Sequence, residues 1–256
     1  MSTPAAPGAL HANFSMLLDG RSIAFSVPVP THPVTLPELL PALFEFNRQL
    51  LAHAVAQEEQ SGRSVSCRAG CGACCRQLVP IGSVEAALLR EWLDQRPAEQ
   101  AQRIRGRFIE GVERLEAVGL RERLEARACV RDTGQLRSLG LDYFRAGVAC
   151  PFLVEDSCSV YEARPMKCRE YLVTSPAINC AKPSPEGVSM VGLPGSFLRA
   201  LLALERWSTG ESPSWLPLIL LLDTVPVDLP TRLPGTEWFE RFVTEFARSQ
   251  LPQATA

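Results

Sequence analysis

Nine cysteines are the residues of this chain best suited to chemistry, and eight of them form two groups. Four fall within nine residues, in the segment Cys67-Arg-Ala-Gly-Cys71-Gly-Ala-Cys74-Cys75. Four more follow in stretches rich in turn formers, at Cys150, Cys158, Cys168 and Cys180. Thiolates gathered this densely in a reducing compartment hold a metal ion or an iron–sulfur cluster. We therefore expect these eight cysteines to be metal ligands.

The adjacent pair Cys74 and Cys75 leaves the number of centres open. Neighbouring side chains diverge, so we do not expect both to bind one ion with good geometry. We expect one of them to bind the metal, while the other packs against neighbouring residues, binds a second centre or acts as a redox thiol. A redox role through a strained disulfide between the two is the weakest of these alternatives. Eight cysteines make either two four-thiolate sites or one site with spare thiols. Cys129 is expected in a helix apart from the groups, and we leave it out.

The ligand set suits both zinc and an iron–sulfur cluster, because thiolate-only sites bind either. The three histidines, His11, His32 and His53, all precede the first group and are isolated from one another. A ligand set without histidine favours an iron–sulfur cluster. The irregular cysteine-rich segment favours zinc instead, because a structural zinc ion would stabilise its fold.

The spacing of Cys67, Cys71 and Cys74 also matches the radical S-adenosylmethionine enzymes. Members of that superfamily usually carry an aromatic residue before the last cysteine, where this chain has Ala73, and βα units follow the motif. Long helices without intervening strands are expected here instead. We reject that fold, although the match keeps a site-differentiated cluster conceivable.

Several basic and aromatic side chains stand beside the cysteines. Cations would lower the thiol pKa values and the cost of burying a centre with a net negative charge. Arg164 and Arg169 are candidates to donate hydrogen bonds to the thiolates or to meet an anionic substrate. The neighbouring basic residues are Arg68, Arg76, Lys167 and Arg169, and the residues expected to pack around the site are Phe152, Leu153, Tyr161 and Tyr171.

The composition excludes several classes of partner. With a formal charge of −2, the chain has no excess of positive charge that would attract nucleic acid or an anionic membrane. The most continuous apolar stretch, Trp215 to Leu222, is broken by Pro217 and falls short of the ~20 residues that cross a bilayer. The N-terminus has neither the basic start nor the apolar run of a secretory signal. We therefore expect a cytoplasmic protein with no nucleic-acid or membrane partner.

The elements that position the cysteines are predicted to be mainly α-helical. Residues 1–12 read as a flexible tail, and Asp19-Gly20 between two alternating runs predicts a small β-hairpin. Thr35-Leu-Pro-Glu38 forms a capping box before a long amphipathic helix, whose regular part Pro41 delays by a turn. We expect one helical domain over residues 13–256, with an irregular metal-binding centre at 67–180.

Downstream helices follow from apolar residues at helical spacing. Ser83 is expected to cap a helix that stops near Pro97, and the next helix presents Ile104, Phe108, Val112 and Leu115. Helical periodicity returns with Phe197, continues through the Leu216–Leu222 run, and ends in a helix capped by Thr236.

The cysteine segments resemble the YkgJ-like cysteine-cluster family, whose signature CxxCxxCC marks a zinc- or iron-chelating domain. The resemblance covers Cys67 to Cys180, and three residues rather than two separate Cys67 from Cys71. The matching segments are Cys71-Gly-Ala-Cys74-Cys75-Arg76, Cys150-Pro-Phe-Leu153, Cys158-Ser-Val-Tyr161 and Arg164-Pro-Met-Lys-Cys168-Arg169.

The resemblance implies a protein that binds zinc or an iron–sulfur cluster for a structural, storage, sensing or transfer role. Proteins that methylate flagellin lysines look similar through the same cysteine cluster. The alternative is therefore an iron–sulfur-dependent, protein-modifying enzyme resembling flagellin lysine N-methylase, which implies a protein substrate. No residue of the chain independently identifies a methyl-donor site.

Overall fold

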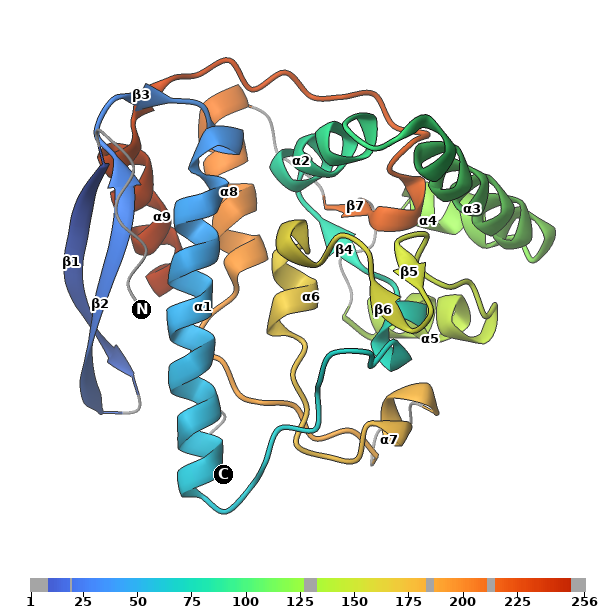
Figure 1. Cartoon of the computed structure of the whole chain (residues 1–256), viewed down its shortest axis with the longest axis horizontal. Helices are drawn as coiled ribbons and strands as arrows, with labels where there is room; N and C mark the ends of the chain where they lie inside the picture. The colour runs from blue at the N-terminus through green and yellow to red at the C-terminus, as the bar shows by residue number, and fades with distance from the viewer. Residues whose placement is uncertain (1–8, 19, 127–132, 183–186, 211–214, 250–256) are drawn as a thin grey trace. The chain divides into compact units, whose positions relative to one another are not determined.

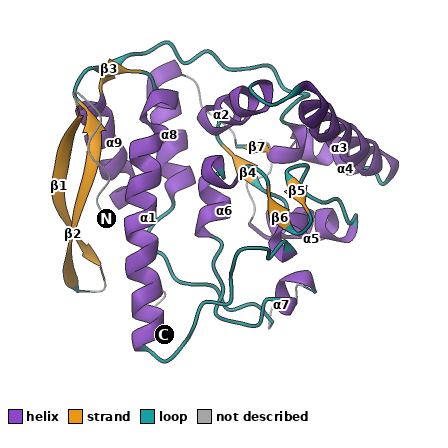
Figure 2. Ribbon diagram, viewed as in Figure 1, coloured by secondary structure: helices purple, strands orange, loops and turns teal. Residues whose placement is uncertain are grey.

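The computed structural model describes residues 9–18, 20–126, 133–182, 187–210 and 215–249. The described chain is mostly helical, with a hairpin near its N-terminus and an irregular region between residues 67 and 180, which confirms the predicted fold class (Figures 1 and 2). Its contacts divide it into two compact units. The first contains Met1–Arg63, Gly192–Pro213 and Asp228–Ala256, and the second contains Ser64–Val191 and Ser214–Val227.

The hairpin of the first unit consists of β1 (Ala9–Leu18) and β2 (Arg21–Pro30). The strands pair antiparallel, and Phe14 lies opposite Phe25. Gly20 has a φ of 76°, a left-handed conformation that glycine adopts without strain, whereas Asp19 lies outside the described residues. The predicted hairpin is therefore confirmed.

Helix α1 (Leu36–Gln60) packs against β2, as Figure 1 shows. Its start follows the predicted capping box, because the Glu38 carboxylate accepts a hydrogen bond from the Thr35 backbone N–H at 2.7 Å. The predicted delay at Pro41 does not occur, since the helix runs through it from Leu36. The cap and the complete burial of Leu36 and Leu40 offset the hydrogen bond that proline removes.

Phe46 of α1 lies at the centre of an aromatic core that α8 (Phe197–Thr209) and α9 (Gly235–Arg248) complete. The Phe46 ring lies 5.2–6.5 Å from six other phenylalanine rings, counted centre to centre, which belong to β1, β2, α8 and α9. The short strands β3 (Pro33–Val34) and β8 (Leu233–Pro234) pair beside it. The first unit thus has a hydrophobic core of its own.

The second unit carries a separate core under four helices, α2 (Ser83–Asp94), α3 (Ala98–Ala117), α4 (Leu120–Glu125) and α5 (Thr133–Arg145). The four apolar residues predicted for the inner face of α3 are all buried, namely Ile104, Phe108, Val112 and Leu115. Helix α2 begins one residue after its cap Gly82, so Ser83 is the first helical residue rather than the predicted cap.

The apolar Leu216–Leu222 run is not the helix that its periodicity predicts. Residues Leu216–Pro217 form β7, which pairs with β4 (Pro80–Ile81), and Leu218–Leu220 form a short 3-10 turn, η4. Pro217 cannot donate an N–H within a helix, and the side chains around it are buried on several sides rather than on one face.

Six short elements carry or flank the cysteines of the second unit. They are η1 (Ala73–Arg76), β5 (Leu153–Val154), β6 (Ser157–Cys158), η3 (Tyr161–Ala163), α6 (Met166–Glu170) and α7 (Ile178–Ala181). Among the described helices, none combines the length and the apolar character required to span a membrane.

Candidate metal centre

All eight candidate cysteines lie in the second unit and are free thiols. They come from separate places in the chain: the loop before η1 supplies two, η1 supplies two, and the other four lie before β5, on β6, on α6 and on α7. Seven are partly buried and Cys180 is fully buried. Segments more than 100 residues apart in sequence are thereby gathered in one region of the fold. Cys129 lies outside the described residues.

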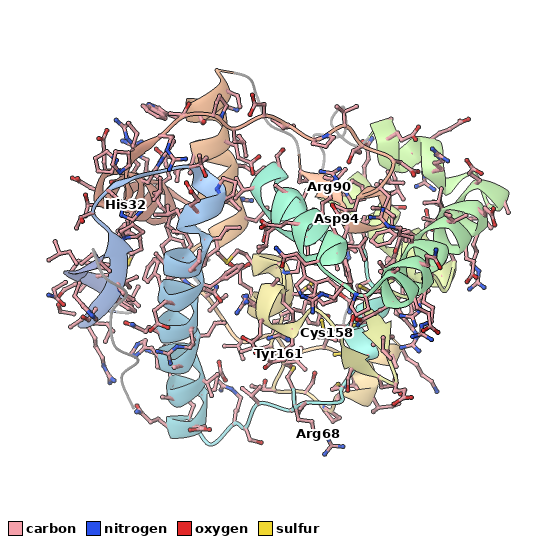
Figure 3. The ribbon with its side chains drawn as sticks, turned by 45° about the horizontal axis from the view of Figure 1, so that its top comes forward. His32, Arg68, Arg90, Asp94, Cys158 and Tyr161 are labelled. Carbon is pink, nitrogen blue, oxygen red and sulfur yellow. The ribbon has the colours of Figure 1, made fainter. Side chains whose placement is uncertain are left out.

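A cavity of about 150 Å³ lies among these segments. Figure 3 labels three residues of its lining, Arg68, Cys158 and Tyr161. Tyr161 is 54% exposed, so this side of the cavity faces solvent. Six of the eight cysteines line it, namely Cys71, Cys74, Cys75, Cys150, Cys158 and Cys168, whereas Cys67 and Cys180 lie outside its lining.

The first cysteine loop packs closely on the β5–β6 hairpin. The Cys150 N–H donates to the Cys75 carbonyl oxygen at 2.6 Å, and Cys158 pairs with Leu153 across the hairpin. A Cβ atom added to Gly72 would lie 2.8 Å from Leu153 Cδ1 and 3.2 Å from the Asp156 Cα atom. Only glycine therefore allows the loop to approach the hairpin this closely.

Tyr171 organises the other side of the cysteine region. The Cys67 thiol donates to the Tyr171 carbonyl oxygen at 3.9 Å, and the Tyr171 hydroxyl accepts a hydrogen bond from Gln77 Nε2 at 2.9 Å. Burial raises the pKa of Cys180, and the Tyr171 side chain contributes to lowering it. This tyrosine, predicted as packing around the site, thus contacts both Cys67 and Gln77, which lie on either side of η1 in the chain.

A buried carboxylate fixes the helix that carries Cys168. Glu85 is 1% exposed, and its two oxygens accept hydrogen bonds from the Gly82 N–H at 2.9 Å and the Met166 N–H at 2.6 Å. Met166 is the first residue of α6. Glu85 therefore joins the start of α2 to the start of α6. A glutamate at the third position of a helix is the only sequence signal for this residue, and it does not indicate the second contact.

Arginines beside the cysteines contact the backbone and the aromatic side chains around the cavity. Arg169 donates from Nε to the Arg164 carbonyl oxygen at 2.8 Å and from its guanidinium to the Glu162 carbonyl oxygen. The Arg164 guanidinium lies 4.1 Å from the centre of the Tyr161 ring, and its Nε has no hydrogen-bond partner among the described residues. Of the predicted basic neighbours, Arg68 lines the cavity, whereas Arg76 donates to the Gly72 carbonyl oxygen at 3.3 Å.

Burial raises the pKa of several of the cysteine thiols, whereas hydrogen bonds and the positive charge of Arg164 lower the pKa of some of them. Burial raises the pKa of Cys150 to about 12 and holds that of Cys168 well above its usual range. A hydrogen bond from the Cys75 thiol lowers the pKa of Cys74 and correspondingly raises that of Cys75. The positive charge of Arg164 contributes to lowering the pKa of Cys67, Cys74 and Cys158, although burial raises the pKa of Cys67 and Cys158 overall.

The donors fit a thiophilic metal in type and number, but they are not arranged around an ion. Within the part of the chain that is described, no three His, Cys, Asp or Glu side chains stand close enough together to hold one. A cysteine side chain turns about a single Cα–Cβ bond among three staggered positions, so its sulfur can move without any change of fold. Thiolates without histidine or carboxylate suit zinc or an iron–sulfur cluster.

Residues 66–184 match a family model named CxxCxxCC and described as a "putative zinc- or iron-chelating domain". This segment is similar to the domains of that family. The match confirms the resemblance seen in the sequence, and it contains all eight candidate cysteines together with Tyr171 and Glu85. No curated protein and no solved structure matches the chain.

Proposed function

We propose that the segment similar to the CxxCxxCC domains binds zinc or iron through thiolates of its eight clustered cysteines. The observation that carries this proposal is their convergence: six cysteines from four separate segments line one cavity, and two more flank Tyr171 beside it. The proposed ligands are Cys67, Cys71, Cys74, Cys75, Cys150, Cys158, Cys168 and Cys180.

The stability that a bound metal would add to this region supports the proposal. The described elements between Cys150 and Cys180 span two to five residues each, too short to be stable through their own hydrogen bonds. A metal that joins the first cysteine loop to the β5–β6 hairpin, α6 and α7 would tie these pieces together. Bound thiolates contribute folding free energy of this kind in structural zinc sites.

The solvent-facing side of the cavity supports a second candidate, an iron–sulfur-dependent enzyme that modifies proteins. Arg68 and Tyr161 line the cavity and are exposed, so a group bound there could meet a substrate from outside. An iron–sulfur cluster, when bound, would supply electron transfer or a Lewis-acidic iron. The residues of the chain would hold it and limit its contact with water.

Metal analysis of the reduced protein, purified without oxygen, tests the proposal. We expect stoichiometric zinc, or iron with acid-labile sulfide and a broad absorption band near about 400 nm. The Cys71→Ser/Cys168→Ser double variant should lose most of the metal, whereas Cys129→Ser should keep all of it. Folded wild-type protein that takes up neither zinc nor iron would refute metal binding. A colourless zinc protein would leave the enzyme candidate without support.

A further inference from the structure

The N-terminal hairpin of the first unit leaves one side of β1 without a neighbouring strand. In Figure 1, β2 lies between β1 and α1, so β1 is the outer strand of the hairpin. Among the described residues, its sheet consists of β1 and β2 alone. The side of β1 that faces away from β2 is called the free edge below. An edge with unpaired N–H and C=O groups is a template for a further strand.

Contacts of Gln49 show which backbone groups point to the free edge. Its side-chain oxygen accepts a hydrogen bond from the Ser26 N–H at 3.2 Å, and its Nε2 donates to the Ser26 carbonyl oxygen at 2.7 Å. The backbone groups of Ser26 therefore point away from β1, and those of Asn13, which lies opposite, point to the free edge. This direction alternates along a strand. The residues of β1 that present N–H and C=O groups at the free edge are His11, Asn13, Ser15 and Leu17.

The outer edge of β2 is protected against further pairing, whereas the free edge of β1 is not. Gln49 occupies one outward position of β2, and Pro28 and Pro30 stand at two others, where they have no N–H to donate. Strand β1 contains no proline and no lysine, arginine, aspartate or glutamate. The His11 carbonyl oxygen accepts a long hydrogen bond of 3.4 Å from the Asn13 side chain, which leaves the other outward groups of β1 open.

Strand β1 can pair antiparallel with itself in a register centred on Phe14. Asn13 then lies opposite Ser15 of the second copy, and His11 lies opposite Leu17, so outward backbone groups meet outward backbone groups. Such pairs exchange two hydrogen bonds each, which gives about eight across the interface. A charged peptide would find no opposite charge along β1, whereas a second copy brings an equally uncharged strand.

The same register brings apolar side chains together. Leu10 is 57% exposed although its strand packs on the aromatic core, and it would lie opposite the buried Leu18 of the second copy. Phe14, which is partly buried, would lie opposite the Phe14 of that copy, and cross-strand aromatic pairs stabilise antiparallel sheets. Helix α1 packs on β2, away from the free edge (Figure 1).

We propose that the free edge of β1 binds β1 of a second copy of this chain and joins two hairpins into one four-stranded antiparallel sheet. The same edge is used by both copies, as in other two-fold interfaces. Each hairpin has one open edge, so the pairing ends at the dimer. This inference goes beyond the proposed metal binding and does not depend on it.

Sedimentation equilibrium of the full chain over a range of concentrations, with reductant present, tests the dimer. We expect the wild type to form a reversible dimer. Ser15→Pro removes an outward N–H that the hairpin does not use, and it does so twice in the interface, so it should raise the dimer dissociation constant by about tenfold or more. The matched control, Ser15→Ala, keeps this N–H and should form the dimer as the wild type does.

Two charged variants test the register and do not depend on a proline. Asn13→Lys with Ser15→Lys places lysine opposite lysine in both central pairs and should give a monomer. Asn13→Lys with Ser15→Glu places lysine opposite glutamate and should keep the dimer. Both side chains are exposed, and the two variants differ only at position 15, so a loss of folding would not produce this difference.

Three results would overturn the inference. The first is a wild type that stays monomeric at every concentration. The second is a dimer that neither Ser15→Pro nor the lysine pair weakens, because another surface would then form it. The third is equal association of the two charged variants, which would exclude the register centred on Phe14. If Ser15→Pro does not fold, the charged variants decide alone, and none of these results bears on the proposed metal binding.

Discussion

The buried carboxylate of Glu85 accepts a hydrogen bond at 2.6 Å from the backbone N–H of Met166, a residue 81 positions further along the chain. The same side chain closes the start of α2 through the Gly82 N–H. A single buried side chain thus joins α2 to α6, the short helix that carries Cys168.

Glu85→Gln should destabilise the second unit and loosen Cys168. The glutamine amide has one acceptor oxygen and an NH₂ donor group, so one of the two N–H groups loses its partner. We expect a loss of about 1–3 kcal/mol in the free energy of unfolding, and faster zinc release to a chelator. Urea unfolding of metal-free protein and the chelator assay measure these effects. Exposed Glu91, on the same helix, supplies the control Glu91→Gln, and a Glu85 variant as stable as this control would contradict the account.

Gly72→Ala should separate the first cysteine loop from the hairpin. The added Cβ would lie 2.8 Å from a Leu153 methyl group and 3.2 Å from the backbone of Asp156, so the hairpin carrying Cys158 has to shift. We expect a cost of about 1–3 kcal/mol in stability and weaker metal binding. Gly106→Ala is the matched control, because Gly106 lies inside α3 with no atom within 4 Å of its added Cβ. That change should be neutral or stabilise the protein by up to about 1 kcal/mol.

Arg164→Gln should weaken metal binding by about tenfold or more, the usual scale for residues that support metal ligands. The substitution removes a positive charge beside Cys67, Cys74 and Cys158. Arg164→Lys should restore part of the affinity, since it keeps the charge but not the planar donor group that stacks on Tyr161. Competition with a chromophoric chelator gives the affinities. Equal affinities for the glutamine and lysine variants would show that charge is not the cause.

The metal-free protein should lose stability in alkaline solution through Tyr143. This side chain is 3% exposed, and its burial, with a smaller contribution from the charge on Cys150, raises the phenol pKa. A pKa raised by folding stabilises the native state below the unfolded value of about 10, and this contribution disappears as the pH rises above it. Urea unfolding at about pH 8 and about pH 11 should show a smaller decline for Tyr143→Phe than for the wild type. Equal declines would contradict this assignment.

Local signals predicted the long elements of the fold. The capping box at Thr35, the Asp-Gly turn and the apolar spacing of α3 depend on residues within a few positions of one another, which is why the sequence suffices. The Leu216–Leu222 run was assigned wrongly because a segment buried on several sides gives no reliable periodicity.

The sequence predicted the eight cysteines as candidate ligands, but it did not predict how the fold arranges them. Which thiol neighbours which depends on a hairpin, two short helices and a tyrosine that the chain brings together over more than 100 residues. Glu85 was missed for the same reason, since its contact with Met166 spans 81 positions. Contacts of this length leave no pattern in a single sequence.

X-ray absorption at the edge of the bound metal tests the central claim most directly, because it identifies the atoms around the metal. We predict a first shell of sulfur alone, with about four neighbours at about 2.3 Å for zinc. For an iron–sulfur centre, the same sulfur shell should be accompanied by a second iron at short distance. A first shell of nitrogen or oxygen would contradict the account, because the metal would then be bound by residues other than the clustered cysteines.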